Sequence, residues 1–259
     1  MGDYYACQIQ INFMKILVFT AKWIGLKCVS YLLDNFPDDN YVFVVGNPNA
    51  DLISNELEKR NQIWYPLDES TISLILSKKN DTYDWLLNLW GGHIFKNDIL
   101  NKCRNSLNIH PSYLPYCKGR DPIVWAIRNG YPSGVTLHKI TSGVDDGPII
   151  YQEKINYSFP ISGGELYEKV VSRAWQMFCE KWGEIRNNNF KLTPQDNLND
   201  NKTFKRKDLI KDRIIDLNKD EFARSIFLRI LAHDFHDDYL SEIIFNKKTY
   251  SAKLIIKEK

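Results

Sequence analysis

Short apolar runs alternate with segments of helical length through the first 110 residues. The runs are KILVFT, YVFVVG, NQIWYP, DWLLNLW and SLNIH, at 15–20, 41–46, 61–66, 84–90 and 106–110. The segments between them carry apolar residues at helical spacing, most clearly over 23–36. Strands that alternate with helices at this spacing form a mostly parallel sheet. The sequence therefore predicts an α/β fold, a Rossmann-like twisted sheet with helices on both faces.

A strand pair and one long helix follow in the second half of the chain. GVTLHKI at 134–140 and PIIYQEKI at 148–155 are predicted to be strands that pair. A helix is predicted over 165–185, because Ser162 and Glu165 match the spacing of an N-terminal capping box. Apolar residues recur at every fourth position on one face of this helix: Leu166, Val170, Ala174, Phe178 and Trp182.

The composition divides the chain into a main domain and a small appendage. Residues 14–190 form the main α/β domain, and the polar, turn-rich stretch 191–203 is predicted to be a linker. Residues 204–259 are predicted to form a small C-terminal α+β appendage, with one helix around 221–231 and closing strands.

The N-terminal extension, residues 1–13, is open to two interpretations. QIQINF alternates polar and apolar residues, as an additional strand would. MKILVFT, which begins at Met14, has instead the form of a natural protein start. The first thirteen residues lack the pattern of a signal peptide, and no run of about 18 apolar residues predicts a membrane span.

Charge and cysteine content constrain the partners and the compartment. With 34 Lys and Arg against 32 Asp and Glu, the net charge of +2 compels no nucleic-acid or membrane partner. The five cysteines are scattered without a CxxC pair, which indicates reduced thiols in a cytoplasm. The first strand–helix turn, TAKWIGLK, contains no GxGxxG, so a dinucleotide cofactor is not supported.

An amide and an imidazole lie two residues apart at the end of the fifth predicted strand. Asn108 and His110 are i and i+2, so their side chains point to the same side of the sheet. Pro111 biases His110 to an extended conformation and ends the strand. Ligands of open α/β sheets bind at the carboxyl ends of the strands. An amide and an imidazole at such an edge can stabilise a developing oxyanion and move a proton.

A carboxylate is available to orient the imidazole. Asp145 lies in the Gly-flanked turn SGVDDGPII between the two later strands. A single Asp in a turn is a weak signal, but the combination is specific. NIHPSYLP, KGRDPIVWAI, GVTLHKI and GVDDGPIIYQ, in this order, resemble the pattern of the 10-formyltetrahydrofolate-dependent formyltransferases. The resemblance runs from about Met14 to the C-terminus and includes TFKRKDL and FLRILAHDF in the tail.

The resemblance implies a catalytic set of Asn108, His110 and Asp145. In this family a free amine of the substrate attacks the formyl carbon carried by 10-formyltetrahydrofolate. Asn108 and His110 would hold the oxyanion, while Asp145 would keep His110 charged and help to remove the amine proton. Because a carboxylate partner raises the pKa of an imidazole, a cationic His110 is predicted near neutral pH.

The resemblance also implies where the pterin ring of the folate binds. Main-chain groups of the loop WGGHIFKNDIL, after the fourth strand, are expected to hold it, and Gly91-Gly92 would allow close backbone approach. The candidates on this loop are Gly92, His93, Ile94 and Phe95. Val144 and Asp146 are expected on the opposite side of the ring.

The acceptor implied by the length and the tail is a dTDP- or UDP-linked amino sugar. A methionyl-tRNA enzyme of the family should be longer and carry a basic C-terminal domain, because phosphate contacts dominate RNA affinity. The glycinamide ribonucleotide enzymes are shorter and lack such a tail. The chain is most similar to the sugar N-formyltransferases, which implies a cytoplasmic role in lipopolysaccharide O-antigen biosynthesis. The alternatives are a methionyl-tRNA or other amine formyltransferase, a hydrolase of formylfolate, and a non-catalytic folate- or nucleotide-binding relative.

Four side chains are candidates for binding the nucleotide sugar: Arg120, Lys118, Trp90 and Tyr113. Arg120 matches a family position near the sugar and phosphates, where a guanidinium suits a diphosphate, although a solvated surface arginine is an equal alternative. Lys118 stands where the family usually has arginine. Trp90, Tyr113 or Trp125 could stack on the nucleotide, although aromatic residues more often belong to the core.

The other histidines and the basic run at 205–207 are predicted to be structural or solvated. His233 and His236 have metal-like spacing, but no third ligand is indicated, so solvated tail residues and no metal are predicted. His138 is expected to pack or to form a hydrogen bond. The closing segment TYSAKLII is rich in β-prone apolar residues, which predicts a homodimer built through the tail.

Overall fold

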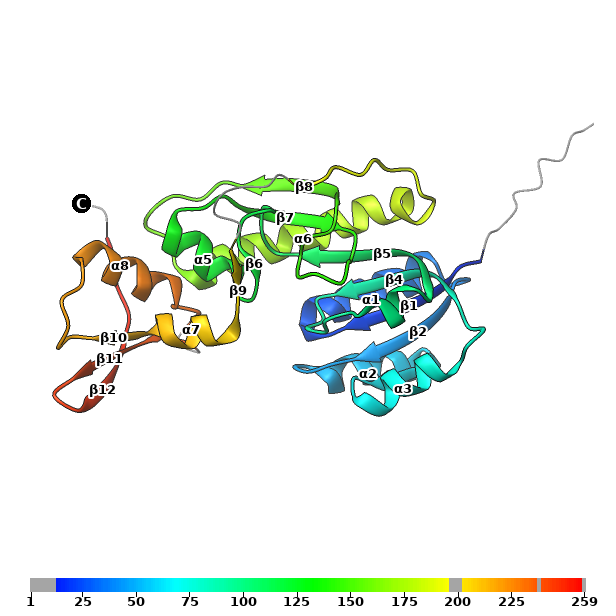
Figure 1. The fold of residues 1–259 in the computed structure, drawn as a ribbon, viewed down its shortest axis with the longest axis horizontal. Coiled ribbons are helices and arrows are strands. Elements are labelled where there is room, and N and C mark those ends of the chain that lie inside the picture. Colours follow the sequence, from blue (N-terminus) through cyan, green and yellow to red (C-terminus); the bar gives the residue numbers. More distant parts are fainter. Residues whose placement is uncertain (1–12, 196–201, 237–238, 258–259) are drawn as a thin grey trace, which may run out of the picture.

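The computed structural model describes residues 13–195, 202–236 and 239–257 of the chain. A seven-stranded sheet with the order β3-β2-β1-β4-β5-β7-β8 forms its centre (Figure 1). Its strands are β1 (Lys15–Thr20), β2 (Asn40–Val45), β3 (Trp64–Pro66), β4 (Tyr83–Leu89), β5 (Cys103–His110), β7 (Ser133–His138) and β8 (Ile149–Ile155). β1 to β5 are parallel, whereas β7 is antiparallel to β5 and β8 to β7. The mostly parallel α/β sheet predicted from the sequence is confirmed.

Two layers of helices cover the sheet. The core on one face involves α1 (Lys22–Asn35), α2 (Ala50–Lys59), α5 (Pro122–Asn129) and α6 (Gly163–Arg186). The core on the other face involves α3 (Glu69–Ser77) and α4 (Asn97–Leu100). β1 alternates between the two cores, because Ile16 and Val18 belong to the first and Leu17 and Phe19 to the second. A strand buried on both sides has to be apolar throughout, which explains the continuous runs in the sequence.

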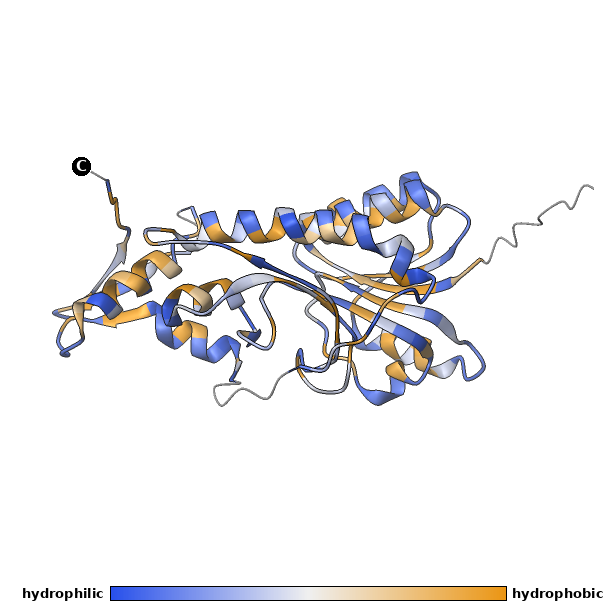
Figure 2. Ribbon diagram, turned by 90° about the horizontal axis from the view of Figure 1, so that it is seen from above, coloured by the Kyte–Doolittle hydropathy of each residue, from blue (hydrophilic) through white to orange (hydrophobic). Residues whose placement is uncertain are grey.

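The capping box predicted at the start of the long helix is present. The N–H of Glu165 donates to Oγ of Ser162 at 3.2 Å, and the N–H of Ser162 donates to Oε2 of Glu165 at 2.8 Å. The periodic apolar residues of α6 recur along its length (Figure 2), and Leu166, Val170 and Trp182 are fully buried.

Two helices were not predicted from the sequence. α5 begins with Pro122 at its first turn and ends at Gly130, which adopts a left-handed φ of 65°. It is buried from Pro122 to Ile127, so its sequence shows no polar face. α7 (Arg206–Arg213) has the opposite character, because Leu209 is its one buried residue and no apolar stripe marks it.

The tail lies at one end of the molecule, next to α5 (Figure 1). Its sheet has the order β10-β11-β12, with β10 (Ile214–Asp216), β11 (Ser241–Phe245) and β12 (Lys248–Ala252). α8 (Ala223–Ala232) is the helix predicted around 221–231. A second, two-stranded sheet joins the tail to the main domain by pairing β9 (Thr203–Phe204) with β6 (Lys118–Gly119).

A buried carboxylate also connects the tail to α5. Asp212 accepts hydrogen bonds from Nε of Arg128, with both oxygens at 2.9 and 3.1 Å, and lies 3.0 Å from Nε2 of His233. The prediction that His233 is solvated is wrong, because its side chain is 0% exposed and pairs with this carboxylate. His236 is exposed, as predicted. The described residues contain no group of three or more side chains that could hold a metal ion.

None of the described helices has the length and apolar content needed to cross a membrane.

Candidate functional site

Three polar side chains form a row across adjacent strands near the carboxyl edge of the parallel strands. The strand register pairs Asn88 of β4 with Asn108 of β5, and Asn108 with His138 of β7. The residues that precede them, Leu87, Leu107 and Leu137, all belong to the core that α1 and α6 cover. Because side chains alternate along a strand, the three polar groups must share the opposite face of the sheet.

Hydrogen bonds fix the orientation of this row. Nδ2 of Asn88 donates to Oδ1 of Asn108 at 2.7 Å, which leaves Nδ2 of Asn108 facing Nε2 of His138 at 2.9 Å. Nδ1 of His138 lies 2.7 Å from the carbonyl oxygen of Lys139. A carbonyl only accepts, so Nδ1 carries the proton and Nε2 accepts from Asn108. The amide of Asn108 therefore presents its two N–H groups toward His138 and Asp145.

Asp145 reaches this row from the turn after β7. One carboxylate oxygen accepts from Nδ2 of Asn108 at 3.3 Å, and the other accepts from the N–H of Gly119 at 2.9 Å. The second oxygen also lies 3.5 Å from Nδ1 of His110. The structure thus brings together the three residues that the sequence singled out, Asn108, His110 and Asp145, with the side chains of Asp145 and His110 only 15% and 6% exposed.

The charge predicted for His110 is wrong for the free protein. Burial lowers the pKa of His110 below its ordinary value, and the opposing effect of Asp145 is smaller than this desolvation. The pKa of Asp145 itself is strongly lowered: burial alone would raise it, but His110, His138 and the N–H of Gly119 together outweigh that effect. The free site therefore holds an ionised Asp145 beside a neutral His110 at neutral pH.

Both nitrogens of His110 nevertheless face hydrogen-bond acceptors. Nε2 lies 3.2 Å from the carbonyl oxygen of Cys117, and Nδ1 faces Asp145. A neutral imidazole can donate to one of these acceptors, whereas an imidazolium can donate to both. The surroundings are therefore prepared for His110 to gain a proton during a reaction.

The loop after β4 lies at the edge of the same row. A Cβ at Gly91 would come within 2.4 Å of Oδ1 of Asn88, so glycine is needed here for the close approach. Ile94 on this loop is 65% exposed, and Val144 on the catalytic turn is 38% exposed. Two exposed apolar side chains at this edge of the sheet could pack against a planar pterin ring. Phe95, in contrast, is buried edge-on against Phe19 with ring centroids 4.8 Å apart, so its side chain is not available to a ligand.

His93 and Asp146 differ in how freely they could meet a ligand. The ring of His93 stacks on Phe19 with centroids 5.2 Å apart, and burial lowers its pKa. Asp146 is exposed, with the hydroxyl of Thr141 as its hydrogen-bond donor.

Cationic side chains gather beside Gly92. Arg120 is exposed, and its Nη1 lies 3.3 Å from the place that a Cβ of Gly92 would occupy. Burial lowers the pKa of Lys22. The charge of Asp121 raises this pKa, and the charge of Arg120 lowers it further. The positive charge of Arg206 also lowers the pKa of Lys22. Nη1 of Arg206 lies 3.7 Å from Oδ2 of Asp121. Lys22 was not predicted as a site residue from the sequence, although its place in the first strand–helix turn puts it at the ligand edge of the sheet.

The other substrate candidates lie in less open surroundings. Lys118 is buried, which lowers its pKa, while the carboxylates of Asp146 and Asp145 oppose that effect. Tyr113 is half-buried and packs over the backbone of Gly134. Trp90 is also half-buried, against the core beneath α1 and α6.

Trp125 is excluded as a nucleotide-stacking residue. It is buried, and its ring already stacks on Phe204 with centroids 4.2 Å apart and 9° between the planes.

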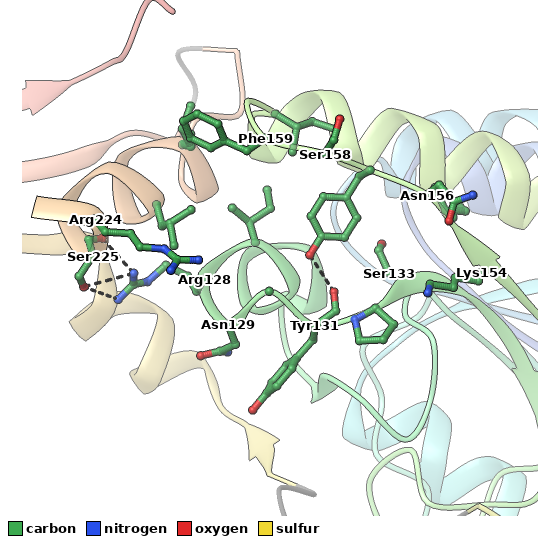
Figure 3. Close-up of a pocket in the computed structure, with 18 of the residues that line it drawn as sticks. Arg128, Asn129, Tyr131, Ser133, Lys154, Asn156, Ser158, Phe159, Arg224 and Ser225 are labelled. Atoms are coloured by element: carbon green, nitrogen blue, oxygen red, sulfur yellow. Dashed lines mark hydrogen bonds between the residues drawn. The ribbon is translucent and has the colours of Figure 1, made fainter.

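A cavity of about 930 Å³ lies elsewhere, between α5, the start of β7, the end of β8 and α8 (Figure 3). Arg128 reaches across one side of it and donates to the carbonyl oxygen of Ser225 at 3.0 Å. None of Asn108, His110 and Asp145 lines this cavity. The chemistry-bearing cluster therefore lies apart from this cavity.

Comparison with known proteins now adds to this geometry. Residues 89–181, which include the whole Asn108–His110–Asp145 cluster, match the model of the formyl transferase family. This segment of the chain is therefore similar to a formyl transferase domain.

The relatives of this domain act on different amines. The methionyl-tRNA formyltransferase of Kosmotoga olearia is 39% identical over 90 residues, which are 34% of this chain and 29% of that protein. The dTDP-4-amino-4,6-dideoxyglucose formyltransferase of Mycobacterium bovis is 29% identical over 163 residues, which are 61% of this chain and 66% of that protein. The chain thus spans between 29% and 66% of the lengths of these two curated relatives.

A solved structure matches most of the chain. The sugar 3N-formyl transferase WlaRD, solved in the presence of dTDP and 5-N-formyl-THF, superimposes with a TM-score of 0.71 at 25% identity. The match covers 91% of this chain and 84% of that one.

Proposed function

We propose that the protein transfers a formyl group from 10-formyltetrahydrofolate to the free amine of a dTDP- or UDP-linked amino sugar. The observation that carries the proposal is the cluster of buried Asn108 and His110 with the partly buried Asp145, within the segment that matches the formyl transferase family. An amide donor, an imidazole and an ionised carboxylate at the ligand edge of an α/β sheet suit acyl transfer to an amine.

The folate supplies an electrophilic formyl carbon. As the amine adds to this carbon, His110, neutral in the free protein, accepts the proton that the amine loses. The formyl oxygen, which gains negative charge, would then replace two acceptors of the free site. The imidazolium would donate to it in place of the carbonyl oxygen of Cys117, and Nδ2 of Asn108 in place of Oδ1 of Asp145. One such donor contributes about 3 kcal/mol. Asp145 stabilises the imidazolium, and His110 returns the proton to N10 of the folate as the bond from that nitrogen to the formyl carbon breaks.

The folate would lie between two loops at this edge. Its pterin ring would contact main-chain groups of Gly92 and its neighbours His93, Ile94 and Phe95 on one side. Val144 and Asp146 of the catalytic turn would lie on the other side. The exposure of Ile94 and Val144 supports this placement.

A nucleotide sugar is favoured as the acceptor for two reasons. Of the two curated relatives described above, the dTDP-amino-sugar enzyme matches over the longer stretch, and the WlaRD structure was solved in the presence of dTDP. In addition, three cationic side chains lie near one carboxylate, Asp121: they are Arg120, Lys22 and Arg206. Their excess of positive charge suits a diphosphate. Lys118, Trp90 and Tyr113 are secondary candidates for this substrate. The near-neutral net charge of +2 provides little for tRNA phosphates.

We also propose a cytoplasmic homodimer that forms through the tail and acts in lipopolysaccharide O-antigen biosynthesis. The tail presents large apolar side chains to solvent, including Phe245, Tyr250 and Ile255, which are 45%, 50% and 82% exposed. β12 is the edge strand of its sheet within the described residues. A two-fold contact would cover both the edge and these side chains.

The test is incubation with 10-formyltetrahydrofolate and a panel of dTDP- and UDP-linked amino sugars, followed by mass spectrometry. The expected result is the mass gain of one formyl group on one of the sugars, which His110→Ala abolishes. Formylation of charged methionyl-tRNA without any sugar product would identify the tRNA acceptor instead. Release of formate without an amine would identify a hydrolase, and ligand binding without turnover would identify a binding protein.

A further inference from the structure

The chain that leaves α6 returns to the catalytic turn before it enters the tail. Thr193 pairs with Ile149 through two backbone hydrogen bonds of 2.8 and 2.9 Å. Two residues later, Nε2 of Gln195 donates to the carbonyl oxygens of Asp145 at 2.9 Å and Gly147 at 2.8 Å. The reverse orientation of this amide would set its oxygen against both carbonyls, so the assignment of Nε2 is secure. One side-chain amide therefore spans the turn that carries the proposed catalytic carboxylate.

This turn requires restraint from its surroundings. Asp145 has a backbone φ of 50°, in the left-handed region. That conformation costs a residue with a Cβ about 1–2 kcal/mol, so neighbouring groups must hold it. The residues on either side, Val144 and Asp146, are both exposed and provide little packing. Gln195, which is partly buried, closes the turn from the other side.

A second restraint acts on the donor to the carboxylate. The N–H of Gly119 donates to Oδ2 of Asp145, and Gly119 lies in β6, which pairs with β9. The carbonyl oxygen of Phe204 in β9 accepts from the N–H of Arg120 at 2.9 Å. The ring of Phe204 is itself held by its stack on Trp125. A Cβ at Gly119 would lie 2.2 Å from the carbonyl oxygen of Phe204, so only glycine lets β6 and β9 approach each other this closely.

We propose that Gln195 is a positioning residue for the Asp145 carboxylate, and that β9 supports the same carboxylate through Gly119. Residues 193–195 and β9 would then support the catalytic group indirectly, through the turn and through Gly119. This inference rests on the proposed formyl transfer. Its consequence acts through His110, because a shift of the turn would lengthen the 3.5 Å separation between Nδ1 of His110 and Asp145.

The first test compares Gln195→Ala and Gln195→Glu with the parent in steady-state formylation. A misplacement of about 1 Å in a catalytic group costs about a hundredfold in rate, so kcat should fall between about tenfold and a hundredfold. The KM for the nucleotide sugar should stay within about twofold, because both hydrogen bonds of Gln195 go to the turn that carries Asp145. Gln195→Glu should lose at least as much, since a carboxylate cannot donate to two carbonyl oxygens.

Asn187→Ala is the matched control. It also removes a side-chain amide that donates to a main-chain carbonyl, that of Gly183 at 3.0 Å, but it lies at the exposed end of α6. Its kcat should equal that of the parent. The melting temperatures of the Asn187 and Gln195 variants should be similar, which separates positioning from a loss of stability.

The second test needs no substrate. NMR titration of the His110 imidazole reports the field of its three charged or titratable neighbours: Asp145 from the turn, His138 from β7 and Lys118 from β6. Asp145 raises the pKa of His110, so a displaced carboxylate in Gln195→Ala should lower that pKa below the parent's value. Fully active Gln195 variants with an unchanged His110 titration would overturn the inference.

The two tests also separate this inference from the proposed function. If the parent formylates no amine, the proposed function fails. The titration still decides the position of the carboxylate in that case: a lowered His110 pKa in Gln195→Ala supports the positioning role, and an unchanged pKa refutes it.

Discussion

Replacing Asp145 with Asn tests the charge of the carboxylate while keeping its shape. The substitution removes a negative charge 3.5 Å from Nδ1 of His110. Two unit charges at that distance interact by about 5 kcal/mol at an effective dielectric constant of about 20. This interaction exists once His110 has gained a proton, so its loss raises the barrier and leaves the free protein little changed. Allowing for partial screening, we expect kcat to fall by about a thousandfold, or about 4 kcal/mol.

The same substitution should have a small effect on stability. Asn retains an oxygen that can accept from the N–H of Gly119, at 2.9 Å in the parent. Its amide nitrogen would face Nδ2 of Asn108, which now donates to Asp145 at 3.3 Å, so one hydrogen bond is lost. Such a loss costs about 1 kcal/mol, which corresponds to a decrease of about 2–4 °C in Tm for a protein of this size.

Mass spectrometry of the formylated sugar gives kcat and KM, and thermal denaturation gives Tm. Asp34→Asn is the control, since Asp34 is a 57% exposed carboxylate that pairs with Arg60 on the surface. It should leave kcat unchanged. If Asp145→Asn retained kcat within tenfold of the parent while losing more than about 10 °C in Tm, Asp145 would be a structural turn residue and the electrostatic argument would be refuted.

Three further predictions concern the substrate, the pH dependence and the assembly. Arg120→Ala should raise the KM for the nucleotide sugar at least tenfold, because a hydrogen bond to a charged group contributes about 1.5–3 kcal/mol. Arg104, which is 76% exposed beside Asp84, provides the control, and Arg104→Ala should leave the KM unchanged. Equal KM values for the two variants would contradict the diphosphate contact. Because burial lowers the pKa of His110, the unfolded chain binds the proton of His110 more tightly, so the free energy of unfolding should fall as the pH drops below about 6.5. Urea denaturation between pH 7 and 5 should show a shallower fall for His110→Gln than for the parent. Identical slopes would be evidence against a buried neutral imidazole. Tyr250→Glu should shift the sedimentation of the protein from dimer toward monomer. Leu52→Glu, at a similarly exposed site on α2, should leave the sedimentation unchanged. A monomeric parent at micromolar concentration would rule out the dimer.

Local patterns in the sequence were sufficient for the sheet and for one half of the site. Each buried strand between two helical layers must be apolar, so the runs at 15–20 and 84–90 could be recognised without knowing their partners. The positions of Asn108 and His110 at i and i+2 fixed their common face by backbone geometry alone. Prediction failed for two short helices: α5 is an apolar run buried from Pro122 to Ile127, which a buried strand would resemble, and α7 is polar almost all round and shows no amphipathic stripe.

Tertiary structure decided the rest of the site, because the remaining contacts join residues far apart in the chain. Asn88 and His138 enter the polar row through the register of β4, β5 and β7, which no local pattern specifies. Gln195 reaches Asp145 across 50 residues from a stretch whose composition indicated a linker. The protonation of His110 depended on packing in the same way: the sequence suggested the partner that raises its pKa, but the stronger opposing effect is desolvation, which arises only when strands and turns close around the ring.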